Sequence, residues 1–241
     1  EGEKLGSFWG YTFAGIWQED EVNAPFVDAN GQTNGKTNGE VYKVKPGNSK
    51  YVDINKDGVY NDADQGIIGC GQPTFNWGWN NTFNYKNFDF SFFVVGFHGF
   101  DIYNATHQMG YNLIKSQQVA GVTPMRELLN RWTPTNTNTN IPGFVNGGTE
   151  NKDFFSTRFV ENGSFIKMKS ITLGYTLPET ACRALGITNL RVYASVQNPF
   201  HITNYSGLDP EATMGSPLVQ GVDWGSYPNS RNYLIGLNFS F

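Results

Sequence analysis

The chain ends in an alternation of apolar and polar positions, NYLIGLNFSF at residues 232–241. The apolar positions are Tyr233, Ile235, Leu237, Phe239 and Phe241. The residues between them are mostly small or polar. Because successive side chains of a strand point to opposite faces, this period of two predicts a β-strand with one apolar face.

Further segments of similar length share this alternation. They are residues 5–13, which show it most weakly, and residues 74–85, 88–97, 165–177 and 190–198. Each has about the 9–11 residues that a tilted strand needs to cross a bilayer. The pattern therefore predicts an all-β chain with about six strands of membrane-spanning length.

The connections between these strands alternate in length. Residues 14–73, 98–164 and 199–231 are long, whereas residues 86–87 form a tight turn and residues 178–189 are shorter. Outer-membrane barrels join their strands by short periplasmic turns and long external loops. The alternation predicts an antiparallel transmembrane β-barrel segment with long extracellular loops and a periplasmic C-terminus.

Composition agrees with a membrane barrel but leaves one alternative open. Aromatic residues make up 15% of the chain, and those near the predicted strand ends fit an interfacial girdle. No stretch approaches the roughly 20 consecutive apolar residues of a membrane helix. A soluble, calcium-stabilised β-sandwich, such as a secreted carbohydrate-binding module, would instead bury the apolar faces as a core. Dependence on detergent separates the two.

About six strands are too few for a self-contained transporting barrel, so we expect the chain to be the C-terminal part of a larger one. It does not begin with Met and shows no targeting segment, so we expect either a processed chain or a piece of a longer one. The net charge of -4 is small, and there is no basic stripe, so nucleic acid is not an expected partner.

Four stretches of the chain resemble the C-terminal end of the SusC/RagA-type TonB-linked outer-membrane transporters of Bacteroidota. They are GSFWGYTFAGIWQEDE at 6–21, YVDINKDGVYNDADQGIIG at 51–69, RFVENGSFIKMKSITLGYTLP at 158–178 and LRVYASVQNPFHITNYSGLDPE at 190–211. They occur in the family's order and span nearly the whole chain. Cys70 departs from the family's pattern, because Asn or another polar residue is expected there.

The resemblance implies a barrel of about 22 strands with an N-terminal plug. It also implies a SusD-like surface lipoprotein as partner, and TonB-driven import of a glycan (oligosaccharide) or a peptide. The plug and the TonB-contacting segment are not in this chain. The residues do not identify the substrate.

The segment DINKDGVYNDAD at residues 53–64 has the spacing of a calcium loop. The expected ligands are Asp53, Asn55, Asp57, the carbonyl of Val59, Asn61 and Asp64. Gly58 allows the sharp turn, and several oxygen ligands suit this hard cation. We expect three converging carboxylates around a structural calcium ion. A surface turn rich in Asp, Asn and Gly that binds nothing is the alternative.

Other candidates are weaker. His98, His107 and His201 have no ligand spacing, and turn formation explains Asp209 and Glu211 better than the paired carboxylates of a glycosidase fragment. We therefore do not expect an enzyme. External aromatic residues would stack on sugar rings or pack within loops; they are Trp132, Tyr205, Trp224 and Tyr227. Cys70 is expected outside and Cys182 in the periplasm, which excludes a disulfide.

Overall fold

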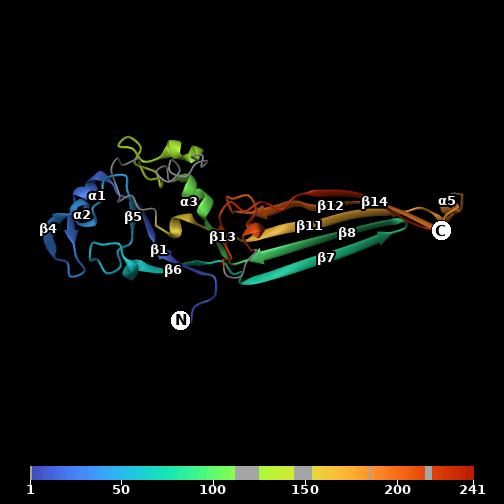
Figure 1. The fold of residues 1–241 in the computed structure, drawn as a ribbon, viewed down its shortest axis with the longest axis horizontal. Helices are drawn as coiled ribbons and strands as arrows, with labels where there is room; N and C mark the ends of the chain where they lie inside the picture. The colour runs from blue at the N-terminus through green and yellow to red at the C-terminus, as the bar shows by residue number, and fades with distance from the viewer. Residues whose placement is uncertain (1, 112–124, 144–153, 185, 215–218) are drawn as a thin grey trace. The chain divides into compact units, whose positions relative to one another are not determined.

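The computed structural model describes residues 2–111, 125–143, 154–184, 186–214 and 219–241 (Figure 1). The chain divides into two compact units. Unit 1 comprises Glu1–Cys70, Tyr103–Val160 and Val222–Gly225, and unit 2 comprises Gly71–Ile102, Glu161–Gly221 and Ser226–Phe241. Among the described residues, no helix combines the length and the apolar character needed to cross a membrane.

Unit 2 is built on one antiparallel sheet with the strand order β14-β12-β11-β8-β7. The strands are β7 (Phe75–Tyr85), β8 (Phe88–His98), β11 (Phe165–Thr176), β12 (Asn189–Thr203) and β14 (Asn232–Ser240). They are 9 to 15 residues long and run side by side in Figure 1. These strands confirm five of the predicted ones, and β12 extends five residues beyond the predicted end at residue 198.

The cross-strand register divides the side chains of this sheet between two faces, because directly opposite residues point to the same side. Large apolar side chains gather on one face, called the apolar face. They are Phe75, Trp77, Trp79, Phe83, Tyr85, Phe88, Phe90, Phe92, Val94, Ile166, Met168, Ile171, Leu173, Tyr175, Leu190, Val192, Val196, Phe200, Ile202, Tyr233, Ile235, Leu237 and Phe239. Many of them are exposed, and Ile235 is 85% exposed.

The opposite face, called the polar face, is continuous across the strands despite a bulge. Lys167 lies opposite Val95, and Val95 lies opposite Gly78. Lys167 therefore shares a face with Asn76, Asn80, Thr82 and Asn84 of β7. The register shifts between Met168 and Ser170. Lys169 is the extra residue of this bulge, and it allows Ser170 and the residues after it to keep the same alternation.

The short connections of unit 2 lie at one end of the sheet. The turn between β7 and β8 is the predicted Lys86–Asn87 pair, with Lys86 at a left-handed φ of 52°. Asn87 Nδ2 donates to the Thr176 carbonyl at 2.8 Å, which ties this turn to β11. Helix α5 (Glu179–Ala184) follows Pro178 in the next connection. The chain ends beside α5 in Figure 1.

At the other end of the sheet, an apolar cluster covers the polar face. It consists of Phe100, Ile102, Phe165 and Tyr205, with Phe97 packed against it. The Phe97 and Phe165 rings stack with centroids 5.1 Å apart. This cluster fixes the chain that follows β12 against the start of β11. The 3₁₀ helix η4 (Pro210–Met214) lies in this segment.

Unit 1 contains short sheets and helices. The antiparallel pairs are β1 (Ser7–Tyr11) with β6 (Gln65–Cys70), β2 (Phe13–Ile16) with β5 (Ser49–Tyr51) and β3 (Pro25–Val27) with β4 (Thr33–Thr37). The helices are α1 (Glu19–Asn23), α2 (Asn38–Tyr42) and α3 (Ala105–Tyr111), and the 3₁₀ helices are η1 (Asp62–Asp64), η2 (Arg126–Asn130) and η3 (Thr157–Phe159). Strand β13 (Val222–Asp223) pairs in parallel with β9 (Asp101–Asn104) through Tyr103 and Asn104. Strands β9 and β10 (Val160–Asn162) carry the chain between the units.

The prediction of a sixth membrane-length strand at residues 5–13 is wrong. The chain there forms β1, which is five residues long and pairs with β6. Phe8 is buried in a core of unit 1 with Tyr103, Ala105 and Phe159. Five residues extend only about 17 Å, which is too short to cross a bilayer. Phe8 and Tyr11 of this segment are therefore buried within unit 1, whereas Leu5 and Trp9 are exposed.

Candidate functional site

The polar face of the sheet carries an ion pair that crosses three strands. Arg191 of β12 donates from Nε to Asp89 Oδ1 of β8 at 2.8 Å, and its Nη2 donates to Asp89 Oδ2. Gly174 of β11 lies between the two strands. A Cβ at Gly174 would lie 2.3 Å from Asp89 Oδ1, so the glycine makes room for this bidentate pair.

Aromatic side chains cover other glycines on the polar face. A Cβ at Gly236 would lie 2.3 Å from the Tyr193 ring, and one at Gly78 would lie 3.2 Å from Phe93. The Arg191 guanidinium lies 5.0 Å from the centroid of Tyr193, within cation–π distance. The polar face is therefore lined by ordered side chains and by a fixed pattern of charge.

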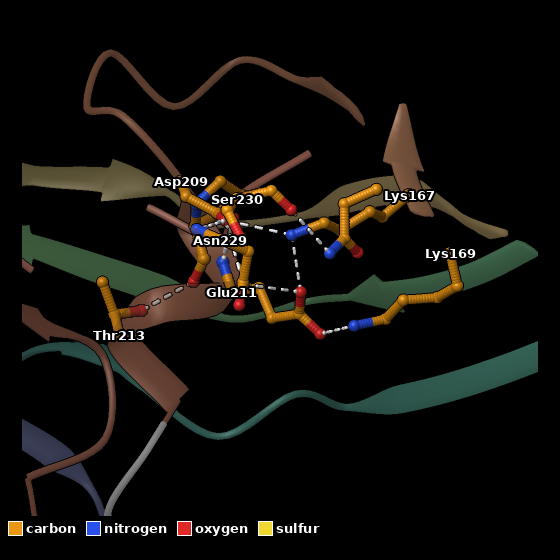
Figure 2. Close-up of polar contacts among 9 residues, drawn as sticks. Lys167, Lys169, Asp209, Glu211, Thr213, Asn229 and Ser230 are labelled. Carbon is orange, nitrogen blue, oxygen red and sulfur yellow. Dashed lines mark hydrogen bonds and ion pairs between the residues drawn. The ribbon is translucent and has the colours of Figure 1, made fainter. Parts of the chain in front are cut away.

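A buried ion cluster lies on the polar face at the other end of the sheet (Figure 2). Lys167 Nζ donates to Asp209 Oδ2 at 2.9 Å and to Glu211 Oε2 at 2.6 Å. The side chains of Lys167 and Asp209 are each 3% exposed. Because isolated charges are costly to bury, this arrangement is stable only while the lysine and the carboxylates stay together.

Two more side chains complete this cluster. Lys169 Nζ pairs with Glu211 Oε1, so two lysines face two carboxylates. Asn229 donates to Asp209 Oδ2 from its backbone N–H at 3.1 Å and from Nδ2 at 3.0 Å. Burial by itself would raise the pKa of Asp209, but the Lys167 ammonium and the N–H groups of Asn229 and Glu211 outweigh burial, so the pKa lies below its ordinary value.

The cluster holds a short segment of chain, called the ledge (residues 204–213), on the polar face. At one end Tyr205 is buried in the apolar cluster. Ser206 donates to Glu161 from its backbone N–H and from its hydroxyl, both at 2.8 Å. At the other end the backbone N–H of Gly221 donates to the Thr213 carbonyl at 3.0 Å. The ledge is thus anchored by apolar, ionic and hydrogen-bonded contacts.

Sequence reasoning missed this cluster. It explained Asp209 and Glu211 by a turn, and η4 does begin beside them at Pro210. The two lysines of β11 were not connected with them, although a Lys-x-Lys pair within a predicted strand was a signal. Lys167 pairs with both carboxylates and Lys169 pairs with Glu211. The two positive charges of the lysines thus balance the two negative charges of the carboxylates. This arrangement is that of a structural ion network.

The candidate calcium loop lies in unit 1 and has ordered side chains. Asp53 Oδ2 accepts from the Gly58 backbone N–H and from the Tyr42 hydroxyl, both at 2.9 Å. Burial, followed by Asp53, raises the pKa of Tyr42 well above its ordinary value, so this phenol stays a donor. Asp53 Oδ1 is buried without a hydrogen-bond partner. A buried, unpaired carboxylate oxygen suits a cation.

The middle of this loop gathers further oxygen and amide groups. Asp57 Oδ2 accepts from Asn55 Nδ2 at 3.0 Å and from Asn61 Nδ2 at 3.1 Å. Asn61 Nδ2 also donates to the Val59 carbonyl at 3.1 Å. The amide oxygens of Asn55 and Asn61 accept from the backbone N–H groups of Asp57 at 3.1 Å and Ala63 at 2.8 Å. The residue types at these positions fit a hard cation, but the amide nitrogens are the atoms that face Asp57.

Asp64 departs from the expected arrangement. It is 1% exposed and accepts from the backbone N–H groups of Ile54 at 2.8 Å and Asn61 at 3.0 Å. In the part of the chain that the structure describes, no three acidic, His or Cys side chains form a metal-binding group. The expected convergence of three carboxylates is therefore absent, because Asp64 holds the backbone of the loop.

The aromatic residues predicted to be external have different surroundings. Tyr205 is buried, whereas Trp224 is 67% and Tyr227 is 90% exposed. Trp132 donates from Nε1 to Gln18 Oε1 at 2.9 Å, and its ring lies against Gly47. Loop packing therefore accounts for Tyr205 and Trp132. Among the histidines, His98 accepts from Trp77 Nε1 at 3.1 Å.

Sequence comparison identifies relatives over the whole chain, although no family model matches it. The chain is 34% identical over its full length to TonB-dependent receptor P3 of Formosa agariphila. It is 30% identical over 82% of its length to TonB-dependent receptor SusC of Bacteroides thetaiotaomicron. It spans only 22% and 18% of these two relatives.

Solved structures show the same fold. The RagAB peptide transporter matches 98% of the chain with a TM-score of 0.67 and 23% identity, over 23% of the transporter chain. The RagAB peptide importer in its 'open-open' state matches with a TM-score of 0.68 and 22% identity, over 22% of that chain. A match to about a quarter or less of each relative fits a C-terminal part. The chain belongs to the SusC/RagA-type family of TonB-dependent receptors.

Proposed function

We propose that this chain forms part of the wall of an outer-membrane barrel that imports nutrients by a TonB-dependent route. The observation that carries the proposal is the division of the sheet in unit 2 into an exposed apolar face and a polar face. Lipid would contact the apolar face, and the cargo passage would follow the polar face. A soluble β-sandwich would cover the apolar face with a second sheet, which the described residues do not do.

The edges of this sheet support a larger barrel. Among the described residues, β7 and β14 each pair along one edge only. Unpaired edges in lipid leave backbone N–H and C=O groups without partners. Strands from the rest of the protein, about 22 in all by family resemblance, would close these edges.

We infer the partners and the class of cargo from the family. A SusD-like lipoprotein would lie over the external side, and a plug and a TonB-contacting segment would come from parts of the protein outside this chain. The cargo would be an oligosaccharide or a peptide, and the similarity to RagAB, described as a peptide transporter, does not decide between them. Growth of a gene-deletion strain on oligosaccharide mixtures or on a protein digest would identify the class.

Surface labelling tests the wall and its orientation. We expect an impermeant maleimide on intact cells to label Tyr227→Cys and to spare Glu179→Cys, because long connections face outward and α5 lies at the short-turn end. Both positions are well exposed, 90% for Tyr227 and 84% for the Glu179 side chain. Both variants are made in a receptor that carries Cys70→Ser, so that the native Cys70 thiol is not labelled. Cys182 is 1% exposed, so a lack of labelling there would not report its side of the membrane. Labelling of Glu179→Cys in intact cells would reverse the orientation.

We also propose that the 53–64 loop binds one structural calcium ion. Asp53 Oδ1, Asp57 and the Val59 carbonyl would be its central ligands, with the amide oxygens of Asn55 and Asn61. Asp64 would hold the backbone and contribute an oxygen only after rearrangement. The buried, unpaired Asp53 Oδ1 supports this proposal, since an ion would compensate it.

The calcium proposal predicts that Asp57→Ala lowers the calcium affinity of the full-length protein about tenfold or more, because a charged ligand is lost. Isothermal titration with calcium and limited proteolysis of the loop measure this effect. Asp62→Ala is the matched control, because Asp62 lies in the same loop outside the ligand positions and accepts from Gln65 Nε2. Equal affinities of the two variants would contradict the assignment.

A further inference from the structure

The ledge presents one large apolar side chain between two anchored positions. Leu208 is 70% exposed, whereas Tyr205 is 5% and Asp209 is 4% exposed. Leucine normally gains from burial, and here the anchors on both sides prevent it from turning inward. The exposed tip of the ledge is therefore imposed by its fixed ends.

The ledge is also rigid by construction. The Tyr205 ring covers Gly207, where a Cβ would lie 2.3 Å from the ring, so the chain turns tightly just before the tip. Ser206 is held by Glu161, and Asp209 is held by Lys167 and Asn229. A loop fixed on both sides in this way keeps its position when a solute passes.

We propose that the ledge is a fixed constriction on the polar face and that Leu208 at its tip determines which sizes of cargo pass. The proposal rests on the proposed import function, because it requires the polar face to line the passage. Lys167 and Asn229, which contact Asp209, and Glu161, which contacts Ser206, act as positioning residues, since they hold the ledge from outside it. The ledge thereby acts as a size filter that does not open and close.

A labelling experiment in the full-length receptor tests this inference without knowledge of the cargo. Ser91→Cys is the reporter. Ser91 of β8 lies on the polar face opposite Thr172 of β11. Thr172 is farther along β11 from the ledge than Lys167, which contacts the ledge. Cys70→Ser and Cys182→Ser remove the native thiols. A biotin maleimide is added to the receptor in membranes, and the labelling rate of the reporter is measured. We expect Leu208→Trp to lower this rate by roughly threefold or more and Leu208→Gly to raise it.

Ile202→Trp is the matched control, because Ile202 is 64% exposed and lies on the apolar face of β12. It adds the same bulk near the ledge but outside the passage, so the labelling rate should not change. Equal rates in all backgrounds, or equal effects of the two Trp variants, would overturn the constriction. Labelling needs neither cargo nor TonB. The labelling test can therefore contradict the proposed constriction while the proposed import function stands. Failure of the import function itself would appear in the growth assay of the gene-deletion strain.

Discussion

Leu237→Arg is expected to destabilise the inserted receptor by about 2–4 kcal/mol, because it places a charge against lipid near the middle of the last strand. Leu237 is 61% exposed on the apolar face, opposite Val192. The free energy of unfolding in urea, measured on the full-length protein in lipid vesicles, reports the loss. Reduced amounts of the variant in the outer membrane would accompany it.

Leu234→Arg provides the matched control, since it makes the same substitution on the opposite face of the same strand. Leu234 lies opposite Ser195 on the polar face, where an arginine stays hydrated, so we expect a change of about 1 kcal/mol or less. Asn238→Arg is less suitable, because Asn238 lies opposite Arg191 and like charges repel. If Leu237→Arg and Leu234→Arg were equally tolerated, the apolar face would not be in lipid.

Lys167→Met is expected to cost about 3–5 kcal/mol, because it leaves Asp209 buried without its cation. The methionine replaces the bulk of the lysine, so the loss reports the charge more than the volume. The ledge should become sensitive to protease at neutral pH. Unfolding in urea measures the global effect, and cleavage within residues 204–213 measures the local one.

Lys169→Met separates this effect from a general loss of positive charge. Its side chain is 29% exposed and, among the carboxylates of the described residues, pairs with Glu211 alone. We therefore expect a loss of about 1 kcal/mol or less. The double variant Lys167→Met/Asp209→Asn should be more stable than Lys167→Met alone, since it no longer buries an unpaired charge. Equal losses for the two single lysine variants would show that burial does not set the importance of Lys167.

The period-two patterns predicted five strands of unit 2 because each of these strands has different surroundings on its two faces. The register confirms the assignment for β14, where Leu237 and Gly236 lie on opposite sides. The same kind of prediction was wrong at residues 5–13, where the segment forms the short strand β1 and contributes Phe8 to a local core. Periodicity reports that one face avoids water; it does not distinguish lipid from a protein core.

The candidate sites likewise had one part that the sequence showed and one part that only the folded chain showed. The calcium spacing was visible because its residues are local, whereas the role of Asp64 was not, since its oxygens accept from Ile54 and Asn61 of the folded backbone. The ion cluster joins Lys167 to Asp209 and Glu211 over 42 and 44 residues. No spacing rule connects residues so far apart.

The sequence by itself determined the all-β class, the two faces of the long strands and the family, because alternation and local motifs depend on neighbouring residues. The tertiary structure decided which strands share the sheet and which carboxylate meets which lysine. It also decided that Leu208 is exposed while Tyr205 is buried. These outcomes depend on cross-strand register and on the balance between burying a charge and pairing it, and that balance exists only once distant segments are in contact.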